Sequence, residues 1–265
     1  MQDMASTPDA PKTPKRLCFF NHAGGVGKST VVRDVGYLLA EQGQRVLLID
    51  ADPQANLTSW LGVRSGVKLE DTLYAAIFGE RRLPVPLEVH GMSLIPSHLD
   101  LAKAELQLAG VVMGVTRLRS AVVSADSYDY VLIDPPPSLG QLSALAVIAA
   151  DRLVVPVPTN VKGFEGVRTV VEMVREYQEA SPELAIGFFA LTLYDERTRH
   201  DRDSLAALSE LSRIAPVSTP LAYRPAAYRD ASLAGIPVPA FAPGSAADRE
   251  LRQLTRELTA ALETR

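Results

Sequence analysis

Six short apolar runs recur along the chain, and segments with a helical spacing of apolar residues separate them. The runs lie at 16–21, 45–50, 92–96, 130–134, 152–157 and 185–191. They are almost continuously apolar, which is typical of strands covered on both faces. Helical spacing occurs over 28–42, 99–108, 112–124, 139–149, 164–179 and 204–214. This alternation predicts an α/β fold: a mostly parallel twisted sheet with helices on both faces.

The two ends of the chain lie outside that alternation. Residues 1–15 are rich in Pro, Ser, Thr and charge and have no apolar run, so we expect a disordered tail without a signal peptide. Residues 246–264 predict a helix whose leucines share one side: Leu251, Leu254, Leu258 and Leu262. Such a stripe can lie on a membrane surface, but the absence of aromatic residues and the mixture of Arg with Glu favour packing against the core.

No stretch approaches the roughly 20 apolar residues that a membrane span needs. We therefore expect a cytoplasmic protein that makes no membrane contact. We find no linker that would divide the chain, and we expect one domain over 16–265.

The composition of the chain excludes several classes of protein. The chain has 265 residues, of which 47% are hydrophobic and 22% charged, so it can bury a sizeable core. Its formal net charge of -4 excludes a broadly basic nucleic-acid binder, and any DNA contact needs a local patch. The single cysteine, Cys18, excludes an internal disulfide and a multi-cysteine metal or iron–sulfur site within one chain.

The segment after the first apolar run, residues 21–30, reads NHAGGVGKST. Glycines let successive backbone N–H groups face a phosphate, and the following helix offers its N-terminus to the same anion. Lys28 would reach the β- and γ-phosphates, and Ser29 would ligate Mg²⁺. The residues expected to bind the nucleotide here are Gly24, Gly25, Val26, Gly27, Lys28, Ser29 and Thr30. The strict motif has glycine six residues before the lysine, where this chain has His22, which is either a catalytic group or a solvent-facing or backbone-capping residue.

Three aspartates follow predicted strands. Asp50 and Asp52 come at the end of the second run, and Asp134 ends the fourth. Residues at i and i+2 of a strand project to the same side, and ligands of parallel sheets bind at the carboxyl ends of strands. One carboxylate can support Mg²⁺ while another orients a water for in-line attack. Each could instead cap a helix, but all three beside this loop favour a nucleoside triphosphate site.

These segments resemble the ParA/MinD family of deviant Walker ATPases, and ParA in particular. The resemblance covers nearly the whole chain from Arg16, and its most specific parts are GGVGKST at 24–30, LLIDADPQANLT at 47–58, SLIPSHLDLAKAEL at 93–106, YDYVLIDPPPSLG at 128–140 and LTLYDERT at 191–198. It implies a P-loop NTPase fold, with Asp52 as the aspartate that orients the attacking water. Asp50 and Asp134 would support the metal. Pro220 and the stretch that ends at Pro243 lie where the family shapes its adenine pocket.

The same resemblance implies a molecular switch. The chain would bind ATP with Mg²⁺, form an ATP-dependent homodimer and then bind nucleoid DNA without sequence preference. A ParB-type activator would stimulate hydrolysis that is slow without it. The cargo would be a chromosome or a plasmid; the alternative is a protein organelle such as the carboxysome.

Residue 23 departs from the family, which has its signature lysine there. Ala23 carries no charge to stabilise the developing phosphoryl charge. Three possibilities stay open: poor hydrolysis, another cation in place of the lysine, or a nucleotide-binding scaffold that shares the fold only. Carboxysome-positioning relatives are similar in lacking the usual lysine and supplying one from later in the chain. Lys162 is the candidate substitute, acting across the dimer, and its alternative is an exposed lysine at a helix start.

Arginines cluster late in the chain, at Arg197, Arg199, Arg202, Arg224 and Arg229. Phosphate contacts from such residues give salt-dependent, sequence-independent DNA binding. Aspartates and glutamates occur in the same region, so a solvated mixed-charge surface is the alternative. The DNA-contacting arginines of the family lie in these late segments, which favours Arg197, Arg224 and Arg229.

Overall fold

The computed structural model describes residues 13–79, 82–123 and 125–263. Within them, one seven-stranded sheet has the order β3-β4-β2-β5-β1-β6-β7. The strands are β1 (Lys15–Phe19), β2 (Val46–Asp50), β3 (Leu87–Val89), β4 (Met92–Ile95), β5 (Tyr130–Asp134), β6 (Arg152–Pro158) and β7 (Ala185–Thr192). All neighbouring pairs are parallel except β3 with β4. The predicted mostly parallel sheet is therefore confirmed.

Successive side chains of the strands enter two separate cores. Leu17 and Phe19 of the first strand belong to one core, and Cys18 belongs to the other. Val46 and Leu48 of β2 share the core of Leu17 and Phe19. This division follows from the alternation of side chains across a strand, and it explains why the strand sequences are apolar throughout.

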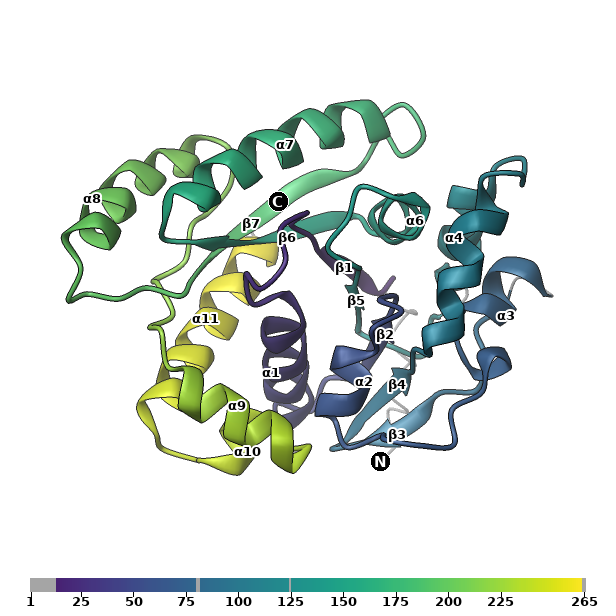
Figure 1. The fold of residues 1–265 in the computed structure, drawn as a ribbon, viewed down its shortest axis with the longest axis horizontal. Coiled ribbons are helices and arrows are strands. Elements are labelled where there is room, and N and C mark those ends of the chain that lie inside the picture. Colours follow the sequence, from purple (N-terminus) through teal and green to yellow (C-terminus); the bar gives the residue numbers. More distant parts are fainter. Residues whose placement is uncertain (1–12, 80–81, 124, 264–265) are drawn as a thin grey trace, which may run out of the picture.

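Helices cover both faces of the sheet, as Figure 1 shows. The first core, with Leu17, is closed by α1 (Lys28–Glu41), α2 (Asn56–Trp60), α9 (Pro225–Ala234), α10 (Val238–Phe241) and α11 (Ala246–Glu263). The opposite core is closed by α3 (Leu73–Phe78), α4 (Ala102–Leu108), α5 (Arg117–Val122), α6 (Gln141–Ala149), α7 (Val161–Tyr177) and α8 (Arg199–Leu208). Short 3-10 turns lie at Leu69–Asp71, Leu99–Leu101, Gly114–Thr116 and Ser209–Arg213.

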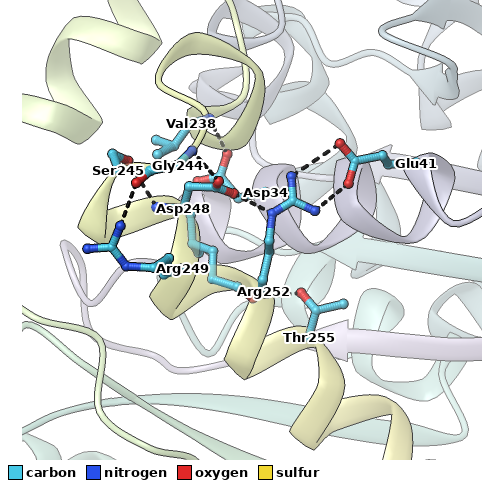
Figure 2. A network of polar contacts seen from close by, with 10 residues as sticks. Asp34, Glu41, Val238, Gly244, Ser245, Asp248, Arg249, Arg252 and Thr255 are labelled. Atoms are coloured by element: carbon cyan, nitrogen blue, oxygen red, sulfur yellow. Dashed lines mark hydrogen bonds and ion pairs between the residues drawn. The ribbon is translucent and has the colours of Figure 1, made fainter.

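The C-terminal helix packs on the core, as predicted. Leu251, Leu254 and Leu258 are buried against the face that α1 also covers. Figure 2 shows a polar link between the same two helices, in which Arg252 contacts both Glu41 at the end of α1 and Asp248 of its own helix. Across the described ranges, no helix has the length and apolarity required to cross a bilayer.

Several boundaries differ from those expected. Lys15, assigned to the tail, is the first residue of β1 because it pairs with Tyr130, while residues 1–12 lie outside the described part of the chain. The helix predicted over 112–124 consists of a 3-10 turn and α5, and Ser124 is not among the described residues. The helix predicted over 204–214 begins earlier, at Arg199, where the Thr198 hydroxyl accepts the Asp201 N–H. The predicted helix end at residue 264 is likewise outside the description.

The elements α2, α3, α9, α10 and β3 were not predicted. β3 is an edge strand of three residues that pairs antiparallel with β4 through the turn at His90 and Gly91, both at positive φ. Its Leu87 is exposed, so the segment has no buried apolar run to indicate a strand.

Candidate nucleotide site

The phosphate loop connects β1 to α1 and is closed by its own lysine. Gly25 and Gly27 have φ values of 73° and 93°, a region that glycine adopts without strain. The Lys28 ammonium donates to the Ala23 carbonyl at 2.9 Å. The Thr192 hydroxyl at the end of β7 donates to the Val26 carbonyl at 2.9 Å. No side chain caps the start of α1, so the first N–H groups of that helix are available to an anion.

Asp50 is fully buried and held in one orientation. Its Oδ2 accepts hydrogen bonds from the Thr58 N–H at 2.9 Å and the Thr58 hydroxyl at 2.6 Å, and its Oδ1 accepts the Asp52 N–H at 3.1 Å. Burial nevertheless raises the pKa of Asp50 to about 7, against the opposing effect of these bonds. The ionised carboxylate therefore needs a nearby positive charge.

Asp134 ends β5 directly beside Asp50, and the two are paired residues of adjacent strands. Both oxygens of Asp134 are buried, and neither accepts a hydrogen bond of good geometry from the described residues, although the neighbouring Ser29 hydroxyl interacts with the carboxylate and acts to lower its pKa. Burial, and then the Asp50 charge, raise the pKa of Asp134 well above its ordinary value. A buried carboxylate with so little hydrogen bonding indicates a missing ligand.

The residues around Asp134 fit Mg²⁺ bound together with a phosphate. In the described ranges, no group of three or more His, Cys, Asp or Glu side chains has the arrangement of a self-sufficient metal site. Mg²⁺ typically takes one or two carboxylates, several waters and phosphate oxygens. Ser29 on the loop and the two strand-end aspartates match that ligand set.

Asp52 lies at the edge of a cavity of about 370 Å³ that opens beside the phosphate loop. Its Oδ1 accepts the Gln54 N–H at 2.9 Å, which fixes the carboxylate near Lys28 and Ser29, two further lining residues. Burial lowers the pKa of Lys28, while the charges of Asp134 and Asp52 oppose that shift. The residues predicted to contact phosphate, Mg²⁺ and the attacking water, Lys28, Ser29 and Asp52, thus line the same cavity.

Much of the remaining lining of the cavity is apolar or aromatic. This part of the lining includes Trp60, Leu193, Leu221, Tyr223, Pro225 and Tyr228. Such a wall suits a nucleoside whose phosphates lie on the loop. Pro220 directly precedes Leu221, whereas Pro243 lies between α10 and α11 and is not part of the lining. Of the two prolines expected to shape the adenine pocket, only Pro220 is adjacent to it.

Lys162, expected in the loop before a helix over 164–179, lies in the first turn of α7, because that helix begins earlier, at Val161. Its side chain lies outside the part of the chain that the structure describes. The backbone of that helix start does approach the loop. A Cβ atom added at Gly166 would lie 3.1 Å from both terminal atoms of the Asn21 side chain.

The three arginines proposed for DNA contact each have an acidic neighbour. Arg197 pairs with Asp195 at 2.6 Å, Arg224 with Glu250 at 2.7 Å and Arg229 with Asp230 at 3.4 Å. Arg224 also lines the cavity beside the phosphate loop. The local contacts are therefore those of a mixed-charge surface, and DNA binding by these residues stays a prediction.

Three site residues were not identified from the sequence. Thr58 orients Asp50, Thr192 holds the loop, and Tyr228 lines the cavity wall. For Thr58 the signal was present, because it closes the LLIDADPQANLT segment. His22 is half-buried, and its Nδ1 is buried without a hydrogen-bond partner among the described residues, so the structure assigns it no capping bond through that atom.

Comparison with known proteins identifies the family. A family model described as an AAA domain matches residues 14–186. The probable plasmid-partitioning protein ParA of Thermus thermophilus is 43% identical over 248 residues, which is 91% of this chain and 76% of that protein.

Two solved structures share the fold over nearly their whole length. The ATP complex of a McdA variant from Cyanothece has a TM-score of 0.79 and 25% identity, covering 95% of this chain and 97% of that chain. Cobyrinic acid a,c-diamide synthase from Mycobacterium smegmatis, with bound ADP and magnesium, has a TM-score of 0.78 and 28% identity, covering 95% and 96%. Together with the ParA relative and the site geometry, these matches show that the chain belongs to the ParA/MinD family of P-loop ATPases.

Proposed function

We propose that the chain is a ParA-like ATPase that binds ATP with Mg²⁺, forms a homodimer and binds DNA non-specifically to segregate or position a chromosome, plasmid or other cargo. A ParB-type activator would stimulate its slow hydrolysis, and the protein would be cytoplasmic and associated with the nucleoid. The observation that best supports this proposal is the convergence of Lys28, Asp50, Asp52 and Asp134 at one edge of the sheet beside the 370 Å³ cavity.

The roles of the residues follow from their positions. Lys28 and the free N–H groups at the start of α1 would hold the phosphates, which requires Lys28 to leave the Ala23 carbonyl. Mg²⁺, when bound, would neutralise charge on the β- and γ-phosphates. Ser29 would ligate the Mg²⁺ ion, and Asp50 and Asp134 would support it from the ends of their strands. Asp52, fixed by the Gln54 N–H, would orient a water in line with the γ-phosphate.

Lys162 would replace the lysine that residue 23 lacks. Asn21, which lies against the first turns of α7, also accepts the Ala23 N–H at 3.0 Å. The start of α7 is therefore next to the loop position that lacks the family's lysine. From this proximity of the backbone we infer that Lys162 serves the nucleotide of the other subunit in a face-to-face dimer.

For DNA, the contacts favour Arg229 over Arg224. Arg229 lines a second cavity, of about 530 Å³, together with Trp60 and Arg64. Arg64 donates to the Leu233 carbonyl, a neutral acceptor, and no carboxylate of the described residues pairs with it. This cavity shares Thr30, Trp60 and Tyr228 with the nucleotide cavity, so a DNA phosphate bound there would lie beside ATP. Arg224, by contrast, is held at the nucleotide wall by Glu250.

A second candidate is the positioning of a protein organelle such as the carboxysome, favoured by Ala23 and the substitute lysine. A nucleotide-binding scaffold with weak or no hydrolysis is the third, and it leaves the placement of Asp52 without a role. Identification of the bound partner by pull-down in the ATP state would separate DNA partition from organelle positioning.

The test of the main proposal is a gel-shift titration of random-sequence DNA with ATP, ADP or no nucleotide, at low and high salt. We expect a shift with ATP that high salt abolishes. Matched turnover assays should show phosphate release that rises when DNA and the ParB-type partner are added. DNA binding that ignores the nucleotide would contradict the proposal.

A further inference from the structure

One segment between β7 and α9 lines the nucleotide cavity with consecutive residues, 221–225, which we call the wall segment. One edge of the wall segment continues the sheet beyond the end of β7. The Leu221 N–H donates to the Leu191 carbonyl at 2.9 Å, and the Tyr223 N–H donates to the Tyr194 carbonyl at 2.8 Å. The wall segment therefore lies beside Tyr194 like a short parallel strand.

A carboxylate of α11 occupies the other edge of the wall segment. Because successive N–H groups of an extended chain point to opposite sides, the Ala222 N–H points away from β7. The Glu250 Oε2 atom accepts this N–H at 3.1 Å, and the Oε1 atom accepts the Arg224 guanidinium at 2.7 Å. The Glu250 side chain is only 25% exposed, so its pair with Arg224 is partly shielded from water. Both oxygens of Glu250 thus hold the wall segment.

The helix after the wall segment is held independently of Glu250. Arg33 and Asp34 of α1 form a completely buried ion pair, with Nε–Oδ1 and Nη2–Oδ2 distances of 2.8 and 3.0 Å. Arg33 also donates to the Ser232 hydroxyl of α9 at 2.8 Å. Asp34 accepts the Val238 N–H at 2.9 Å, a contact drawn in Figure 2. Loss of the Glu250 contacts should therefore loosen the wall segment and leave α9 in place.

We propose that Glu250 is a positioning residue for the nucleoside of the bound nucleoside triphosphate, because it holds the wall segment against which that nucleoside packs. This inference rests on the proposed function, which places the triphosphate on the 24–30 loop. Glu250 is not part of the cavity lining, whereas Ala222 and Arg224 are. It therefore acts on the nucleoside through these two residues.

The chemistry of the wall segment suits a nucleoside better than a phosphate. Glu250 compensates the charge of Arg224, so the segment offers a phosphate no unpaired cation. Apart from Arg224, its residues are apolar or aromatic, which suits a base or a ribose. The residues predicted to contact phosphate and Mg²⁺ line the same cavity of about 370 Å³. A triphosphate bound to them would leave its nucleoside within reach of the wall segment.

The same helix supplies a matched control. Glu257 lies two helical turns after Glu250 and so on the same side of α11. Its carboxylate accepts the Thr219 N–H at 2.8 Å and the Thr219 hydroxyl at 2.7 Å. Thr219 precedes the wall segment and is not part of the cavity lining. A change at Glu257 tests whether any weakened contact with α11 alters nucleotide binding.

The experiment is calorimetric titration of the full chain with ATP and, separately, with inorganic tripolyphosphate, both with Mg²⁺. Glu250→Ala removes both contacts, Glu250→Gln keeps an acceptor for the Ala222 N–H, and Glu257→Ala is the control. We expect Glu250→Ala to weaken ATP binding about fivefold, the size of one hydrogen bond, without weakening tripolyphosphate binding. Glu250→Gln should lose less ATP affinity than Glu250→Ala, and Glu257→Ala should change neither affinity.

Three results would overturn the inference. The first is a Glu250→Ala protein that binds ATP as the wild type does. The second is equal weakening of ATP and tripolyphosphate, which marks a structural role alone. The third is a Glu257→Ala protein that loses as much ATP affinity as Glu250→Ala. The failure of the proposed function looks different, because the wild-type chain would then bind neither ligand.

Discussion

Asp50 and Asp134 are paired residues at the ends of adjacent parallel strands, and both carboxyl groups are fully buried. Each pKa is raised, chiefly by burial. Two neighbouring buried carboxylates cannot both ionise without a cation beside them. This pair therefore links the charge state of the site to pH and to Mg²⁺.

The pH dependence of stability follows from this linkage. A carboxyl group whose pKa is higher in the folded than in the unfolded state binds more protons when folded, so the free energy of unfolding falls as pH rises between the two values. For Asp50 that window runs from about 4, the unfolded value, to about 7 in the folded protein. We expect the Mg²⁺-free protein to lose stability over this range, and Asp50→Asn to lose less. Urea unfolding of both proteins in EDTA at several pH values measures this pH dependence of stability. Identical pH profiles for the wild type and Asp50→Asn would refute the prediction.

Asp52→Asn should separate binding from hydrolysis. The amide keeps the size of the side chain but cannot act on the water as a carboxylate does, so we expect turnover to fall about 100-fold or more. ATP affinity should change little because the phosphates are held by the loop. Phosphate release and ATP titration measure the two quantities. Retained turnover would remove Asp52 from the chemistry.

The substitute-lysine proposal is tested by loss and rescue. Lys162→Ala should abolish ATP-dependent dimerisation or turnover, while Lys103→Ala, which changes an exposed side chain on α4, should have no effect. Introducing Ala23→Lys into the Lys162→Ala protein should restore activity, because it returns the charge to the family's usual position. A Lys162→Ala protein that dimerises and hydrolyses ATP normally would contradict the proposal that Lys162 replaces the missing lysine.

Removing one member of the buried pair on α1 should destabilise the fold. Asp34→Ala leaves Arg33 buried without its carboxylate, so we expect a loss of about 3–5 kcal/mol in the free energy of unfolding. The double change Arg33→Leu with Asp34→Asn leaves no buried charge and should recover most of that loss. Urea unfolding of the wild type, the single variant and the double variant measures these free energies. Equal destabilisation by the single and double changes would argue against the uncompensated charge as the cause.

The strands and the polar residues at their ends could be predicted because parallel strands buried on both faces produce apolar runs, and Asp50 and Asp134 end two of them. The short elements were missed where packing, and not local pattern, decides the conformation. β3 has an exposed leucine and pairs along one edge only. α9 is held by Arg33 and packs Gly235 against Gly62, contacts between distant segments that no local spacing encodes.

The buried ion pair illustrates the same limit. Arg33 and Asp34 lie in a helix that the sequence predicts well, where two adjacent charged residues ordinarily mark a solvent-facing side. They are buried because α9 and α10 cover them and supply Ser232 and the Val238 N–H. The position of Tyr228 depends on the same packing of α9 over α1. The sequence alone therefore could not assign Tyr228 to the nucleotide cavity.

The molar mass of Asp52→Asn in solution tests whether this chain is an ATP-controlled switch. Light scattering with ATP and Mg²⁺ should give the mass of a dimer, while the same protein with ADP, or without nucleotide, should give the mass of the 28.6 kDa monomer. A mass that stays the same in all three conditions would show that ATP does not control assembly of the chain.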